Sequence, residues 1–175
     1  MKKGFVVLAL VLSCFTVNAQ SFKGLDASPM DAVSYPMSYK TSEKVVKIIY
    51  SRPQLKGRTV ESLAKKGEVW RMGANEATEI RFYKDVIFGG KKVEAGTYSL
   101  FAIPGEKEWT IILNNDIDVW GAYSYSEEHD VVRVKGQVSK NEESIEPFTM
   151  VFDNKMNLYL AWGNEIVTVP MSEEK

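Results

Sequence analysis

Short apolar segments separated by turn-forming residues run along most of this chain, and this alternation constrains the fold more than any other feature. The segments are rich in Val, Ile, Phe, Tyr and Trp, the residues that favour pleated, half-buried strands. Their short length and close spacing leave almost no room for helices. The expected strands are residues 33–39, 44–50, 78–83, 86–88, 91–93, 97–103, 109–113, 131–138, 147–152, 158–162 and 166–169.

Turn signals predict how several of these segments are connected. A Pro-Gly sequence within residues 104–107 predicts the clearest hairpin in the chain, and Gly89-Gly90 predicts another. Pro36 lacks a backbone N–H, so the strand that contains it is expected at the edge of a sheet. Thr59 is the expected N-cap of one short helical turn.

Together these features predict an all-β fold, a single β-sandwich or jelly-roll-like domain of about ten short strands with at most one short helix. With 175 residues, of which 45% are hydrophobic and 11% aromatic, the chain has enough apolar surface for one ordinary core. The domain is expected over residues 33–171. An irregular lead-in (20–32) precedes it, and a polar tail (172–175) follows.

Residues 1–19 have the pattern of a cleaved export signal. Two lysines supply its positive start, residues 5–12 supply its apolar core, and Ala19 is the small residue expected before the cut. The apolar run is too short to span a bilayer. We therefore expect an exported protein, periplasmic or secreted. A second interpretation stays open, in which the residues ending at Cys14 are a lipid-attachment box that anchors the protein through Cys14.

Charge and residue counts exclude several classes of function. The 22 Lys and Arg against 23 Asp and Glu give a net charge of −1, which provides no basic field for nucleic acid. A lone histidine, His129, in a polar loop and no cysteine in the expected mature chain exclude a His/Cys zinc site, and phosphate-loop, dinucleotide and Gly-x-Ser-x-Gly motifs are absent. Asn114, Asp116 and Asp118 have the spacing of a calcium loop, but Val119 replaces the glycine of its sharp turn. We expect no cofactor and no metal.

The first candidate site lies within residues 51–78, where four cations gather in an otherwise near-neutral chain: Arg52, Lys56, Arg58 and Arg71. Arginine can hold a carboxylate or phosphate through two parallel hydrogen bonds, and Trp70 could stack on a ring of the same ligand. Asn75 and Glu76 add an amide and a carboxylate beside these groups. In a structural alternative, Arg52, Arg58 and Arg71 instead pair with Glu61, Glu68 and Glu76 to fix a connection that is poor in strands.

The second candidate site is a polar and aromatic stretch over residues 114–125. Trp120, Tyr123 and Tyr125 could form a stacking wall for a sugar or another flat ligand. The alternative is that these rings only close the open end of the sandwich.

Both stretches carry motifs of a known family. The motifs are Tyr50-Ser51-Arg52-Pro53, Lys56-Gly57-Arg58, Trp70-Arg71, Gly73 to Thr78, Ala95 to Phe101, Ile103-Pro104-Gly105, Trp109, Ile112 to Asn114, Trp120 to Tyr123, Asp130 to Val134 and Trp162 to Pro170. On these motifs the chain resembles the bacterial domain-of-unknown-function family 2911 over nearly all of residues 28–171. Met72 departs from the family pattern, where a small polar residue is expected. The resemblance implies an exported all-β domain and supplies no activity.

Three functional hypotheses follow. In the first, the two stretches form a groove that binds an acidic or sugar-like ligand or an envelope protein, with Arg71 central to binding. In the second, Glu76 is the general acid or base of an enzyme acting on a glycan or envelope polymer, which requires its burial beside Trp70. In the third, the motifs only maintain the fold of an interaction or scaffold domain. We favour a non-catalytic module.

Overall fold

The computed structural model describes residues 21–174, and the expected export signal with Cys14 lies outside this range. Ten strands form two sheets, which confirms the all-β prediction. The strands are β1 (Met30–Tyr35), β2 (Val46–Ser51), β3 (Thr78–Phe82), β4 (Val86–Phe88), β5 (Lys91–Val93), β6 (Gly96–Ile103), β7 (Glu108–Asn114), β8 (Asp130–Phe152), β9 (Leu158–Val169) and β10 (Met171–Glu173). Within residues 21–174, helical structure is limited to the single turn α2 (Val60–Leu63) and the 3₁₀ turn η2 (Glu127–His129). Neither has the length or apolar character to cross a bilayer.

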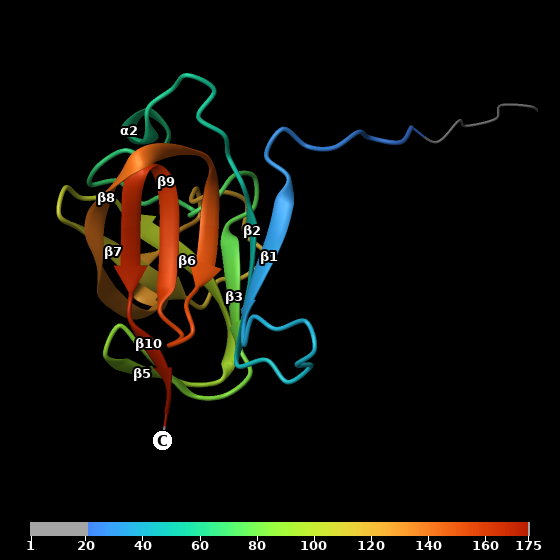
Figure 1. Cartoon of the computed structure of the whole chain (residues 1–175), viewed down its shortest axis with the longest axis vertical. Coiled ribbons are helices and arrows are strands. Elements are labelled where there is room, and N and C mark those ends of the chain that lie inside the picture. Colours follow the sequence, from blue (N-terminus) through green and yellow to red (C-terminus); the bar gives the residue numbers. More distant parts are fainter. Residues whose placement is uncertain (1–20, 175) are drawn as a thin grey trace, which may run out of the picture.

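The seven-stranded sheet follows the order of the chain, β1-β2-β3-β6-β7-β8-β9, and every neighbouring pair is antiparallel. The hairpin of β4 and β5 interrupts this meander and forms the small sheet together with β10. Figure 1 shows β1, β2 and β3 on one side of the molecule and β7, β8 and β9 on the other. The helical turn α2 lies at one end, and the small sheet lies at the opposite end.

The large sheet curls because the chain leaving β2 pairs with the second half of β8. The N–H of Leu55 donates to the carbonyl of Glu146 at 3.2 Å, and the N–H of Phe148 donates to the carbonyl of Pro53 at 2.9 Å. These bonds connect the two sides of the curled sheet and enclose the core. At the centre of the core Trp70 stacks on Trp162, with ring centroids 5.4 Å apart.

Local predictions from single residues agree with the structure. The side chain of Thr59 accepts a hydrogen bond from the N–H of Ser62 and caps α2. Gly89 and Gly90 form the turn between β4 and β5. Strand β1 lies at an edge of the large sheet, as Pro36 predicts, although Pro36 itself follows the strand.

The last quarter of the chain differs from its predicted strands. Segments 131–138 and 147–152 are parts of one strand, β8, and segments 158–162 and 166–169 are both parts of β9. Residues 139–146 are mostly polar, and most of them are exposed in the structure. The segment therefore lacks the apolar pattern from which a strand is predicted. Antiparallel pairing with β9 continues through this region, with shifts of register at Lys140/Ile145 and Ile145/Thr149. The short strand β10 was not expected from the sequence.

Candidate functional site

The two candidate stretches of the sequence meet in space and are joined by backbone hydrogen bonds. The N–H of Ala77 donates to the carbonyl of Val119, and the N–H of Gly121 donates to the carbonyl of Asn75, both at 2.9 Å. Glu76 and Trp120 form the antiparallel bridge between these bonds. The backbones of residues 75–77 and 119–121 therefore lie side by side.

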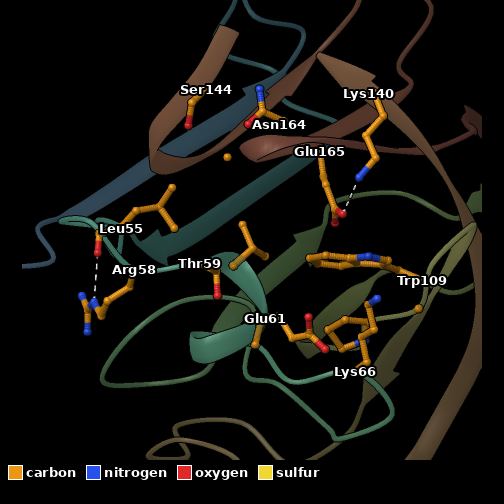
Figure 2. A pocket seen from close by; sticks show the side chains of 15 residues that line it. Leu55, Arg58, Thr59, Glu61, Lys66, Trp109, Lys140, Ser144, Asn164 and Glu165 are labelled. Carbon is orange, nitrogen blue, oxygen red and sulfur yellow. Dashed lines mark hydrogen bonds and ion pairs between the residues drawn. The ribbon is translucent and has the colours of Figure 1, made fainter. Parts of the chain in front are cut away.

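Two hollows flank α2 at this end of the molecule. The first, of about 280 Å³, lies between α2 and the loop that carries Tyr123, and Arg71 lines it. We call it the Arg71 hollow. The second, of about 370 Å³, is bounded by α2, by the turn after β6, and by β8 and β9. Figure 2 shows the indole of Trp109 among the side chains that line it, and we call it the Trp109 pocket.

A tight turn in the backbone positions Arg71. The N–H of Thr78 donates to the carbonyl of Arg71 at 3.1 Å, and the buried hydroxyl of Thr78 donates to the carbonyl of Met72 at 2.7 Å. Met72, where the family pattern predicts a small polar residue, is fully buried with a φ of 52°. That left-handed conformation is one that Asn and Asp adopt more readily than other non-glycine residues, so it explains the expected residue type.

Gly121 lets the second stretch approach Arg71. Its φ is 70°, and a Cβ at this position would lie 2.8 Å from the ring of Tyr123 and 3.5 Å from Nη1 of Arg71. A larger residue would separate these two side chains. The Tyr123 side chain is 85% exposed, so its ring is open to solvent beside the half-buried guanidinium.

The Arg71 guanidinium lacks partners in the part of the chain that the structure describes. Its Nε is buried and makes no hydrogen bond, and no ion pair to Arg71 is formed among residues 21–174. A guanidinium remains charged at any physiological pH, and its N–H groups match the oxygens of a carboxylate or phosphate.

Arg52 has the opposite environment. Its Nε donates to the carbonyl of Phe148 at 3.1 Å, its Nη1 to Asp31 at 3.0 Å and its Nη2 to the hydroxyl of Thr149 at 2.7 Å. These three contacts tie β2 to β1 and β8. Arg52 is therefore occupied in holding the sheet together.

Lys56 and Arg58 lie away from the Arg71 hollow. Arg58 donates to the carbonyls of Leu55 and Gln54 at 2.9 and 2.8 Å, and the backbone N–H of Lys56 donates to the carboxylate of Glu146. The structural alternative had paired the arginines with Glu61, Glu68 and Glu76. In the structure Arg52 pairs with Asp31, and Arg58 binds carbonyls.

Trp70 is 7% exposed and belongs to the aromatic core, in contact with Trp109, Phe148 and Trp162. Although Trp70 lines the Arg71 hollow, this burial and these ring contacts show that its main role is in the core. Trp120, by contrast, is 61% exposed.

Asn75, Glu76 and Trp120 line a smaller hollow of about 190 Å³ with Asp26. The backbone N–H of Ser28, and then the side chain of Asn75, lower the pKa of the Asp26 carboxyl by hydrogen bonding to it. Glu76 is exposed and does not line the Arg71 hollow.

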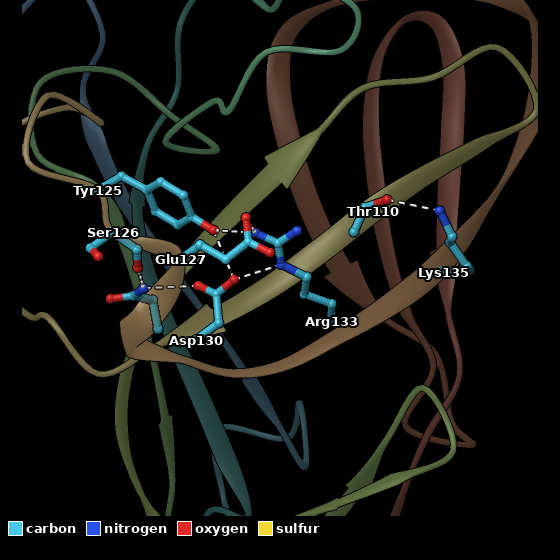
Figure 3. Close-up of polar contacts among 8 residues, drawn as sticks. Thr110, Tyr125, Ser126, Glu127, Asp130, Arg133 and Lys135 are labelled. Carbon is cyan, nitrogen blue, oxygen red and sulfur yellow. Dashed lines mark hydrogen bonds and ion pairs between the residues drawn. The ribbon is translucent and has the colours of Figure 1, made fainter.

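Tyr125 takes part in a polar network that holds the loop against β8 (Figure 3). Its hydroxyl donates to Asp130 at 2.8 Å and accepts from Nη2 of Arg133 at 2.7 Å, while Nε of Arg133 donates to Asp130 at 2.6 Å. Burial, and then the Asp130 hydrogen bond, raise the pKa of Tyr125 to about 12. Its ring packs edge-on against Phe101, so Tyr125 holds the loop in place and does not face the hollow.

Asn114, Asp116 and Asp118, which have the spacing of a calcium loop, each form hydrogen bonds with other residues of the chain. The amide of Asn114 donates to Asp130 and to the carbonyl of Ser126, and its Oδ1 accepts from the N–H of Asp116. Within residues 21–174 no group of three or more His, Cys, Asp and Glu side chains is placed to hold a metal ion. His129 binds Asp116, with Nδ1 and Oδ2 2.7 Å apart.

The Trp109 pocket was missed by sequence analysis. Its lining residues come from chain regions around 55–66, 104–109, 140–144 and 163–165. No local motif joins these regions. The signals in the sequence were the candidate residue Arg58 and the family motifs that contain Pro104, Trp109 and Gly163, all of which line the pocket.

Comparison with known proteins identifies a family but no function. A family model described as "Protein of unknown function (DUF2911)" matches residues 28–171. This match confirms the resemblance drawn from the sequence motifs. The chain matches no curated protein and no solved structure.

Proposed function

The chain belongs to the DUF2911 family of unknown function, and we propose that it is an exported, non-catalytic binding module whose Arg71 hollow takes an acidic group of its ligand. The observation that carries this proposal is the Arg71 guanidinium, which has a buried Nε without a hydrogen-bond partner. A buried donor left unpaired costs about 1–3 kcal/mol, and more in a charged group. A carboxylate or phosphate in the hollow would pair with the part of this half-buried guanidinium that lines the hollow.

The surroundings of Arg71 favour a ligand with more than a bare charge. The exposed ring of Tyr123 provides a flat surface beside the guanidinium. Ser62 and Lys65 from the α2 side add a hydroxyl and a second cation, although Lys65 also pairs with Glu68 at 3.5 Å. These groups suit an acidic ligand with a sugar-like or otherwise flat body.

The carboxylate-enzyme hypothesis has less support. It requires Glu76 to be buried beside Trp70 with Arg71 stabilising charge. Glu76 is exposed and bridges to Trp120, and it lines different hollows from Arg71. For these reasons we favour binding over catalysis.

Export is the second part of the proposal and rests on the pattern of residues 1–19. Signal cleavage after Ala19 would give a mature protein that begins at Gln20. The intact mass of the protein purified from its host distinguishes this outcome from lipid attachment at Cys14.

The binding proposal predicts that Arg71→Glu abolishes binding without unfolding the protein. The test is a thermal-shift screen of the purified protein with glucuronate, galacturonate, acidic oligosaccharides and phosphate compounds. A ligand at about 100 times its Kd stabilises the fold by about 2.7 kcal/mol. We expect a hit with the native protein and none with Arg71→Glu.

The control is Arg81→Glu, which makes the same charge change on β3, where Arg81 is exposed and lies over the ring of Tyr83. Binding that survives Arg71→Glu, or that is lost equally in Arg81→Glu, would contradict the proposal. If no acidic compound binds and Arg71→Ala lowers only the Tm, the scaffold hypothesis explains the motifs instead.

A further inference from the structure

Exposed apolar side chains gather beside the backbone bridge of Glu76 and Trp120. Two adjoining hollows open there, of about 130 and 190 Å³, and Met30, Ser51 and Glu76 line both of them. Ile49 lines the first and Trp120 the second, and the side chains of Met30, Ile49 and Trp120 are all exposed. We call the two hollows together the Trp120 groove. Exposed apolar side chains rimmed by polar residues are typical of surfaces that bind a partner.

The charged side chains that line the Trp120 groove all have one sign. They are the four carboxylates of Asp26, Glu76, Glu79 and Asp118. None of the four forms an ion pair within residues 21–174. Lys47 and Arg81, which pair with each other two positions farther along β2 and β3, line neither hollow. By charge complementarity the groove favours a cationic partner.

The size and the apolar lining of the groove indicate the form of this cation. Each hollow is smaller than the range of about 300–1,000 Å³ that is typical of small-molecule sites. Two hollows side by side therefore suit two side chains of a longer chain better than one free ligand. Lysine and arginine combine an apolar stem with a charged head. The stem matches Met30 and Ile49, the head matches the carboxylates, and a cation can also lie on the exposed ring of Trp120.

We propose that the Trp120 groove binds a basic segment of a partner protein, with lysine or arginine side chains in its two hollows. In an extended segment alternate side chains point to the same side, about 7 Å apart, so two of them can enter adjoining hollows. The inference goes beyond the acidic-ligand proposal, because no residue lines both the Arg71 hollow and the Trp120 groove. It gives Glu76 and Trp120 a role that the Arg71 hollow does not.

Quenching of tryptophan fluorescence by acrylamide tests this proposal. The chain has four tryptophans, of which Trp70, Trp109 and Trp162 are buried, so a quencher in solution acts mainly on Trp120. The probes are the terminally blocked peptides Gly-Lys-Gly-Lys-Gly and Gly-Arg-Gly-Arg-Gly, with Gly-Glu-Gly-Glu-Gly as the control. We expect a basic peptide, and not the acidic one, to protect Trp120 from quenching in a saturable manner. The affinity should fall as salt is added, because salt screens charges at an exposed surface.

Variants of Glu76 locate the binding, because this exposed residue lines both hollows. Glu76→Gln should weaken the peptide affinity about two- to fivefold, as expected for the loss of one exposed ion pair. Glu76→Lys should weaken it more than about tenfold, because it adds a repulsive charge. The matched control is Glu143→Lys, the same change at an exposed position of β8, which should have little effect. Arg71→Glu should not weaken peptide binding, which separates this site from the Arg71 hollow.

Four outcomes would overturn the proposal. In the first, neither basic peptide protects Trp120 at low salt. In the second, Glu76→Lys and Glu143→Lys weaken the affinity equally. In the third, spermidine binds as tightly as the peptides, which would assign the groove to a small polyamine. In the fourth, quenching decreases with protein concentration when no peptide is present, which would assign the groove to a second copy of this chain.

Discussion

At the residue scale, side chains of the same type have very different roles. Arg52 and Arg71 occur in the same cation-rich stretch and look equivalent in the sequence. All three guanidinium nitrogens of Arg52 donate hydrogen bonds, to Phe148, Asp31 and Thr149. The buried Nε of Arg71 has no hydrogen-bond partner among residues 21–174. The difference comes from β8, which lies next to Arg52 and was distant in sequence.

His129 offers a pH-dependent test at this scale. The hydrogen bond and charge of Asp116 raise the pKa of the imidazole above its ordinary value near 6.5. The stabilising contact is therefore fully present below about pH 6.5 and is lost as the pH rises through the higher folded pKa. Because His129 is the only histidine, its ring-proton titration can be followed without assignment.

We expect Asp116→Asn to lower the measured pKa of His129. The Tm difference between the native protein and this variant should also shrink from about pH 6 to about pH 8. A His129 pKa that is unchanged by Asp116→Asn would show that the two side chains do not interact in solution.

At the element scale, turns and caps follow local residues while strand length does not. Thr59 caps α2 and the glycine pair closes the β4–β5 hairpin, both as the sequence indicates. The polar residues 139–146 nevertheless continue β8, because the backbone pairs with β9 even where side chains face solvent. Apolar periodicity detects buried strand segments and misses exposed ones.

The Gly89-Gly90 turn gives a matched pair of variants. Both glycines have positive φ, 55° and 82°, but a Cβ at Gly89 would lie 2.5 Å from the Cβ of Val134, whereas a Cβ at Gly90 would meet open space. Gly90→Ala should cost about 1–2 kcal/mol for backbone strain. Gly89→Ala should cost about 1–3 kcal/mol more because β8 must move.

Denaturation in guanidinium chloride measures both unfolding free energies. The expected order is native, Gly90→Ala, Gly89→Ala, from most to least stable. Equal losses in the two variants would mean that the small sheet does not pack against Val134 as described.

At the scale of the whole molecule, stability depends on the aromatic core. The chain's one cysteine lies in the expected signal, so an intrachain disulfide cannot form. Trp70 bridges to Ala102 of β6 and packs against Trp109, Phe148 and Trp162, which belong to β7, β8 and β9. Its side chain thus connects three strands of the large sheet, and its backbone joins a fourth.

Trp70→Ala should lower the free energy of unfolding by about 3–5 kcal/mol. The reason is the cavity left among the rings, and the measurement is chemical denaturation followed by circular dichroism. A loss below about 1 kcal/mol would contradict the core role and would reopen the hypothesis that Trp70 stacks on a ligand.

Features that depend on near neighbours in the chain could be predicted from the sequence alone. These are the all-β class, the hairpin turns, the Thr59 cap and the membership of DUF2911. Turn and cap preferences arise from the φ of a few residues and from hydrogen bonds within one turn, so they can be predicted locally.

Which distant groups meet depends on the tertiary structure. It joins Glu76 to Trp120 by a backbone bridge and pairs Arg52 with Asp31. It also buries Trp70 and assembles the Trp109 pocket from four separate regions of the chain. These contacts depend on how far the large sheet curls and on the register of its strands. That curl follows from the pairing of residues 53–55 with β8, an interaction across about ninety positions of sequence that no local pattern encodes.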